Sequence, residues 1–139
     1  MKKPLPLICV CFALFAVFSC KKFIEQKKQD MLVSAITNGV WIVEQYKEDT
    51  SDITAGFQGY EFRFSENGTV TGTKDGNTAN GTWTGDINTR TISSNFPNIG
   101  EPVKKLNGIW LLTDTYWDYV EALMTTETGK NQLHLRKKS

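Results

Sequence analysis

NGVWIV, at residues 38–43, returns almost unchanged as NGIWLL at residues 107–112. Asn-Gly pairs favour tight turns, because both residues tolerate positive φ angles. The Val, Ile, Leu and Trp residues that follow favour a strand with one buried face. We therefore predict that each copy begins a run of strands in a closed β-meander, and that the first copy also begins the closed sheet itself.

Short β-rich runs continue to the end of the chain, separated by Gly, Asn, Asp and Pro. This texture is typical of an all-β barrel or sandwich. The predicted strands are residues 40–46, 59–64, 68–73, 81–85, 89–94, 108–113, 117–124 and 132–137. Most connections have the composition of hairpin turns, including the run 74–80. Two connections are longer: we expect 48–58 to be an entrance loop, and 96–107 to cross one end of the sheet.

Alternation of apolar and polar residues assigns one buried face to each strand. Tyr60, Phe62 and Phe64 alternate with polar residues, so we expect their rings to point inward. A flat sheet of eight such strands leaves its apolar face open, whereas closure removes both edges. The predicted fold is an all-β, eight-stranded antiparallel up-and-down barrel with room inside for packed side chains or one small ligand.

A short helix is expected before the barrel. Met31, Leu32, Ala35 and Ile36 have the spacing of one helical face, and the Asn-Gly pair that follows is a stop signal. We place this helix at about residues 26–37. Residues 20–37 are then a tether and short helix, and residues 38–139 are the barrel domain.

Residues 1–19 have the pattern of a secretory signal peptide. Lys2 and Lys3 precede the uncharged apolar run 5–18, and a small residue stands directly before Cys20. The end of this segment resembles the lipobox of bacterial lipoproteins, which implies that Cys20 is acylated and becomes the first mature residue. Cys20 is then the one thiol of the mature chain, so no disulfide forms within it. The alternative is an ordinary secreted protein.

Gly39-Val40-Trp41, placed after a helix at the start of the first strand, resembles the G-x-W signature of lipocalins and of the lipocalin-like small lipoproteins common in the Bacteroidetes. The resemblance implies that Gly39 permits a tight entry, that Trp41 plugs the closed end of the barrel, and that Arg136 packs on Trp41. Because alternation puts Arg136 opposite Leu135, this pair requires a bulge or a wrap around the barrel end. The second copy, at Trp110, has two explanations. Either Gly108 again permits a turn and Trp110 again fills the core, or the two copies arose by gene duplication.

Composition argues against several classes of function. Loss of Lys2 and Lys3 with the signal peptide leaves 14 of the 16 basic residues against 15 acidic ones, which does not suit a nucleic-acid-binding surface. His134 is the one histidine and is expected on the solvent face, so we predict no catalytic constellation, no metal site and no cofactor. The polar run 74–80 lacks the bidentate carboxylate of a calcium loop and is interpreted as a turn.

We expect a lipid-anchored protein of the cell envelope, located on the periplasmic or the surface face of the outer membrane. Two functional hypotheses remain for it. In the first, inward aromatic side chains line a cavity that binds a small apolar ligand without catalysis; the candidates are Tyr60, Phe62, Phe64, Trp83 and Trp110. In the second, the core is filled and the barrel is an interaction or inhibitor module that contacts another envelope protein or a secreted enzyme. Its contact surface is then the loop 48–58 and the hairpin that carries Tyr116, Trp117 and Tyr119. The size of the interior cavity discriminates between the two hypotheses.

Overall fold

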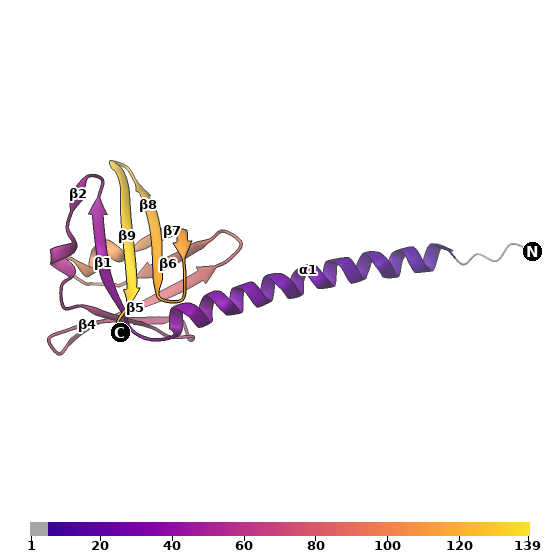
Figure 1. Cartoon of the computed structure of the whole chain (residues 1–139), viewed down its shortest axis with the longest axis horizontal. Helices are drawn as coiled ribbons and strands as arrows, with labels where there is room; N and C mark the ends of the chain where they lie inside the picture. Colours follow the sequence, from indigo (N-terminus) through magenta and orange to yellow (C-terminus); the bar gives the residue numbers. More distant parts are fainter. Residues whose placement is uncertain (1–5) are drawn as a thin grey trace, which may run out of the picture.

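One long helix leads into a closed antiparallel β-barrel (Figure 1). The computed structural model describes the backbone of residues 6–139 and the surroundings of side chains from Cys20 onward. The elements are α1 (Pro6–Thr37), β1 (Trp41–Glu48), β2 (Ser51–Asp52), the 3₁₀ helix η1 (Thr54–Phe57), β3 (Glu61–Phe64), β4 (Thr69–Lys74), β5 (Asn77–Asp86), β6 (Thr91–Asn95), the 3₁₀ helix η2 (Val103–Leu106), β7 (Gly108–Thr115), β8 (Tyr119–Thr126) and β9 (Gly129–Lys137).

The eight long strands pair in chain order, and β9 returns to β1 to close the barrel. This confirms the predicted eight-stranded up-and-down barrel. The two-residue strand β2 is an addition, which folds back on the end of β1 through Lys47 and Glu48. Each sequence copy of the opening motif does begin a strand, β1 and β7 respectively.

The closure is uneven on the two sides of β1. Seven residue pairs join β1 to β9, with a bulge at Glu44, whereas the single pair Trp41–Phe62 joins β1 to β3. Away from that pair, η1 fills the gap: Phe57 is buried and its ring stacks on Tyr46 with 5.2 Å between the centroids. A side chain therefore replaces a ladder of hydrogen bonds at this seam.

Helix α1 is much longer than predicted, because it begins at Pro6 and not near residue 26. The run between Pro6 and Gly39 contains no further Pro or Gly, and its Lys, Glu and Gln residues favour helix. The helix stops as predicted at the Asn-Gly pair, where Gly39 has a φ of 90°. The expected signal peptide extends over residues 1–5, which lie outside the described part, and over helical residues whose side chains are not described.

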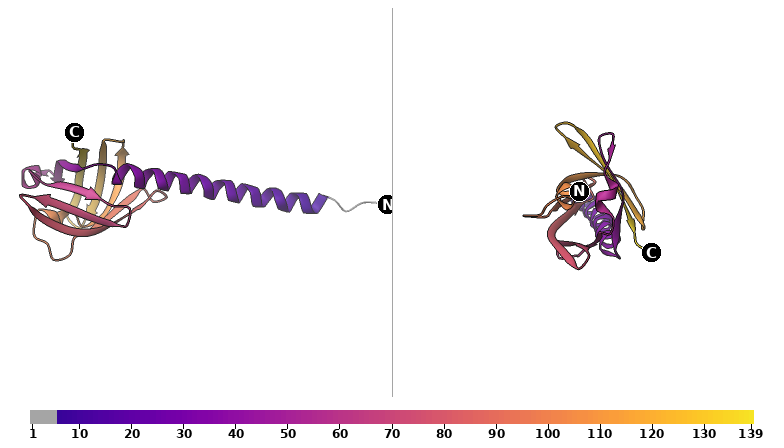
Figure 2. Two further views of the ribbon diagram at one scale, coloured as in Figure 1. Left: turned by 90° about the horizontal axis from the view of Figure 1, so that it is seen from below. Right: turned by 90° about the vertical axis from the view of Figure 1, so that its left-hand side faces the viewer.

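Only the end of α1 is attached to the barrel, and the rest projects away from it (Figures 1 and 2). The Gln29 side chain donates to the Gly85 carbonyl over 2.7 Å and accepts from the Ile87 amide over 2.8 Å. Leu32 and Ile36, one and two turns further on, are buried against the barrel. No helix in the described part of the chain combines the length and the apolar character that crossing a bilayer requires.

The β4–β5 connection is shorter than predicted. Asp75 and Gly76 both have positive φ, 52° and 78°, and Lys74 pairs with Asn77 across a two-residue turn. Strand β5 therefore begins at Asn77, in a polar run that its composition assigned to a loop. Pairing with β4 and β6 supplies the strand hydrogen bonds that local propensity does not predict.

Candidate functional site

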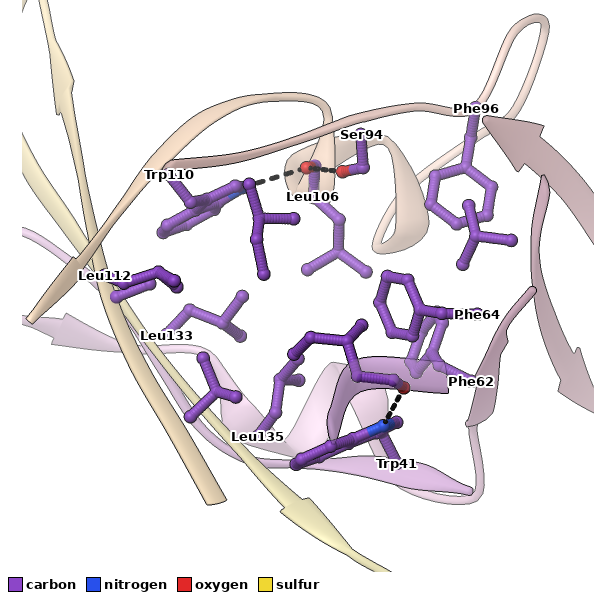
Figure 3. A pocket seen from close by; sticks show the side chains of 15 residues that line it. Trp41, Phe62, Phe64, Ser94, Phe96, Leu106, Trp110, Leu112, Leu133 and Leu135 are labelled. Carbon is purple, nitrogen blue, oxygen red and sulfur yellow. Dashed lines mark hydrogen bonds between the residues drawn. The ribbon is translucent and has the colours of Figure 1, made fainter. Parts of the chain in front are cut away.

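The barrel interior is filled by side chains and leaves a void of about 40 Å³ (Figure 3). Its walls are almost entirely apolar and come from most of the strands, from α1 and from η2. Drug-sized ligands occupy pockets of roughly 300 to 1,000 Å³. The void is therefore far smaller than a ligand pocket.

Three of the five residues predicted to line a ligand cavity face this void, namely Phe62, Phe64 and Trp110. Tyr60 and Trp83 do not line it. Tyr60 precedes β3, and its ring stacks on Phe62 with the Lys74 ammonium 5.2 Å from the ring centroid. The Trp83 indole packs edge-on against Phe64 and donates to the Ser65 carbonyl over 2.8 Å. These residues were misassigned because alternation gives the face of a strand but not the depth a ring reaches.

Trp41 is fully buried at the end of the barrel that α1 covers. Its indole N–H donates over 2.8 Å to the carbonyl of Ile36, in the last turn of the helix. The cation over its ring is Lys137, whose ammonium lies 5.2 Å from the ring centroid. Gly39 lies beside the same side chain: a Cβ built there would be 3.6 Å from the Lys137 Cδ.

The predicted packing of Arg136 on Trp41 is wrong. The Arg136 Nε donates to Glu44 over 2.8 Å on the outer face, and its Nη1 lies 3.9 Å from Asp118. The pairing of Trp41 with Lys137 explains this outcome, because alternation along β9 turns residue 137 toward the indole and residue 136 away from it.

Trp110 repeats the arrangement of Trp41 in the second half of the chain. It is buried, it follows the short helix η2, and its indole N–H donates to the Leu106 carbonyl over 3.0 Å. The repeated motif thus places an indole under the helical segment that precedes each copy. Tyr46 packs edge-on against Trp110 and donates its hydroxyl to the Lys105 carbonyl over 2.8 Å. Burial, opposed in part by the Asn131 hydrogen bond, raises the pKa of Tyr46 to about 12.

The polar residues weighed for chemistry lie on the outside of the barrel. His134 is partly exposed, with its Nε2 3.8 Å from a carboxylate oxygen of Glu121. Tyr119 donates its hydroxyl to Asp114 over 2.8 Å, which raises the pKa of the phenol. Among the side chains described from residue 20 on, no cluster of three His, Cys, Asp or Glu residues could hold a metal ion.

A groove lies on the outer surface, between α1 and the β7–β8 turn. It has a volume of about 310 Å³, and mainly apolar atoms line it. We call it the aromatic groove; its residues include Lys28, Met31, Ala35, Ile87, Tyr116 and Trp117. Tyr116 is 66% exposed, Met31 60% and Trp117 50%. Sequence reasoning singled out the Tyr and Trp but missed Met31, whose neighbour Leu32 takes the buried position.

Two further contacts support the shape of the β7–β8 turn. The rings of Tyr116 and Tyr119 stack with 6.1 Å between their centroids. The Lys137 ammonium lies 6.0 Å from the Trp117 centroid as well as over Trp41. The exposed Trp117 is therefore connected through one lysine to the buried end of the barrel.

Cys20 is exposed and precedes Gln29, the first residue of α1 that is hydrogen-bonded to the barrel, by nine positions. Its side chain lines neither the interior void nor the aromatic groove. Phe23 and Ile24, one turn further on, are also exposed.

Comparison with known proteins supports the fold and leaves the family open. No protein-family model matches the chain, and the curated proteins give no match. The structure is similar to the crystal structure of a DUF4847 family protein from Bacteroides vulgatus, with a TM-score of 0.56 and 17% sequence identity. The match covers 78% of this chain and 99% of that chain. At this identity the likeness extends to the barrel architecture alone.

Proposed function

We propose that this protein is a lipid-anchored binding module of the cell envelope that contacts a partner protein through the aromatic groove. It acts by binding and not by catalysis. In this proposal, acylated Cys20 holds the molecule at the outer membrane and the barrel is a rigid support for Tyr116 and Trp117. The partner is another envelope protein or a secreted enzyme that the module inhibits.

The observation that carries the proposal is the contrast between the interior and the surface. The void inside the barrel measures about 40 Å³, whereas the aromatic groove measures about 310 Å³ and exposes two aromatic rings at its rim. Exposed Tyr and Trp side chains are frequent anchors in protein interfaces. The apolar-ligand hypothesis is less well supported, because a ligand must first displace packed core side chains.

A photo-crosslinking experiment tests the groove. A benzophenone amino acid replaces Trp117 in one variant and Thr128, an exposed residue of the β8–β9 turn, in a matched control. We expect a discrete adduct from position 117 only, identified by mass spectrometry. With the purified partner, Tyr116→Ser combined with Trp117→Ser is expected to weaken binding at least tenfold.

The opposite results would return support to the interior-ligand hypothesis. They are equal crosslinking from both positions, together with an apolar compound that co-purifies with the protein in about equimolar amount. Such a compound would be detected by solvent extraction and mass spectrometry. A fluorescent fatty acid is titrated in parallel. The groove proposal predicts no binding below the millimolar range, and tighter binding would support the interior-ligand hypothesis.

The anchor is tested separately by labelling cells with an alkyne fatty acid. We expect the wild-type protein to be labelled and Cys20→Ala to be unlabelled, because Cys20 is the residue that the lipobox-like segment presents for acylation. Equal labelling of the two proteins would contradict the lipoprotein proposal and leave the groove proposal intact.

A further inference from the structure

We propose that residues 21–28, the first two turns of the mature helix, form a contact surface for an anionic lipid bilayer. The inference rests on the proposed anchoring at Cys20, and goes beyond it by assigning side chains that touch the membrane. The segment reads KKFIEQKK and lies between the expected acylation site and the point where α1 meets the barrel. We call it the membrane-contact segment.

Two large apolar side chains in this segment have no role in the barrel. Phe23 is 64% exposed and Ile24 is 54% exposed. The hydrogen bonds that dock α1 on the barrel begin with Gln29, and the buried Leu32 and Ile36 follow. Lys22, Glu25 and Gln26 border a surface pocket beside the β5–β6 turn, and neither Phe23 nor Ile24 lines it. Neither Phe23 nor Ile24 lines the aromatic groove. Both side chains are therefore available to a surface other than the barrel.

Helical spacing puts these side chains on the same face as the expected anchor. Phe23 and Ile24 follow Cys20 by three and four positions, so all three share one stripe of the helix. Lys27 continues the stripe by one turn, with its ammonium 5.4 Å from the Phe23 ring centroid, and Lys28 follows at the edge of the aromatic groove. On this face the apolar side chains come first after the anchor and Lys27 follows one turn further on, an order that matches the depth profile of a membrane interface.

The charge of the segment identifies the kind of surface. Its four lysines are Lys21, Lys22, Lys27 and Lys28, against the single acid Glu25. Each lysine held near an anionic membrane strengthens binding by about fivefold at moderate salt. Four lysines distributed around the helix beside exposed Phe23 and Ile24 therefore fit anionic phospholipid headgroups above an acyl layer.

The test uses the chain from residue 20 with Cys20→Ser, which keeps every described contact between α1 and the barrel but cannot be acylated. It is mixed with vesicles of phosphatidylcholine alone or of phosphatidylcholine with phosphatidylglycerol, and binding is measured by co-sedimentation. We expect binding to the anionic vesicles that weakens as salt is raised. Phe23→Ser with Ile24→Ser, and separately the four Lys→Gln changes, are each expected to weaken it at least tenfold.

The matched control is Ile109→Ser with Leu111→Ser, an equally exposed apolar pair on the outer face of β7. This variant is expected to bind within twofold of the unaltered chain, and circular dichroism verifies that each variant is folded. Absence of binding to anionic vesicles, or equal effects of the two Ser pairs, would overturn the inference. So would loss of a protein complex in Phe23→Ser with Ile24→Ser while vesicle binding stays unchanged.

The two proposals fail in distinguishable ways. Fatty-acid labelling of Cys20 without vesicle binding by the unacylated chain contradicts the membrane-contact segment alone. Absence of labelling contradicts the anchor, whichever result the vesicles give.

Discussion

At the scale of single residues, Trp41 and Trp110 answer the same local requirement. The carbonyls in the last turn of a helix lack partners within that helix. At the ends of α1 and η2, a buried indole N–H that follows an Asn-Gly pair supplies one. The apolar part of each ring fills core at the same time. Each Trp therefore caps the end of the preceding helix by a hydrogen bond and packs into the core from the strand that follows.

Replacing Trp41 with Ala is expected to lower the free energy of unfolding by about 3 to 5 kcal/mol, the usual cost of emptying a large aromatic site. Trp41 is fully buried, whereas Trp117 is half exposed. Trp117→Ala is the control and is expected to cost less than about 1 kcal/mol. Urea denaturation measures both changes, and equal effects would mean that Trp41 does not plug the barrel.

Ionisation of Tyr46 is expected to lower the stability of the barrel at alkaline pH. Its pKa is about 12 in the folded protein and about 10 when unfolded, because burial disfavours the phenolate. The folded state thus holds the proton more tightly. This contribution to stability is fully present below pH 10 and is lost as the pH rises to 12, by about 2 to 3 kcal/mol.

The alkaline effect is measured by urea denaturation between pH 9 and pH 12. Tyr46→Phe removes the titrating hydroxyl and keeps the ring, so its stability is expected to fall less steeply across this range. Parallel pH profiles for the two proteins would show that another group controls the alkaline limit.

At the scale of elements, α1 has two parts with different roles. From Gln29 to Thr37 it belongs to the barrel domain, because its side chains close one barrel end and bond the β5–β6 turn. The part of the helix that precedes Gln29 leads outward (Figure 2) and exposes the large apolar side chains of Phe23 and Ile24. The continuous helical backbone makes the second part a stiff spacer whose reach is about 1.5 Å per residue.

The docking of α1 predicts a sharp contrast between neighbouring residues. Leu32→Ala is expected to destabilise the fold by about 2 to 4 kcal/mol, because it empties a buried site against the barrel. Met31→Ala removes a side chain that is 60% exposed and is expected to cost less than about 1 kcal/mol. Thermal unfolding measures both. Similar losses would mean that Leu32 is not the side chain that α1 buries against the barrel.

At the scale of the whole molecule, the strands of the barrel are not paired equally: β8, β9 and β1 are paired along most of their length, whereas the β1–β3 seam, the weak side, has few strand hydrogen bonds. Eight residue pairs join β8 to β9 and seven join β1 to β9, while one pair joins β1 to β3. The packing of Phe57 and the Tyr46–Thr54 hydrogen bond hold the weak side together. Local opening is expected where few ladder hydrogen bonds have to break.

Hydrogen exchange measured by mass spectrometry tests this asymmetry. We expect residues 53–61, which span η1 and the approach to β3, to take up deuterium at least tenfold faster than β8 and β9. Phe57→Ala is expected to accelerate exchange in this segment further while β8 and β9 stay protected. Uniform protection around the barrel would show that the β1–β3 seam is as stable as the rest.

Much of the fold could be predicted from local patterns. Asn-Gly pairs predicted where the main strand runs begin, and the alternation around Phe62 and Phe64 predicted which side chains face inward. Eight amphipathic runs with short connections predicted closure, because an open sheet of this kind exposes its apolar face. The pattern was less informative for β5, whose polar beginning becomes a strand through its neighbours.

The sequence by itself determined the eight strands of the barrel, their order and the closure, because turn chemistry and period-two alternation act over a few residues. Only the tertiary structure decided what the inside and the outside can bind. The size of the void depends on how rings from distant strands interlock, which no local pattern encodes. The choice of Lys137 over Arg136 for Trp41 depends on the β1–β9 register. The aromatic groove exists because Gln29 holds α1 on the β5–β6 turn, 56 and 58 residues away in sequence, and the helix then lies beside Tyr116 and Trp117.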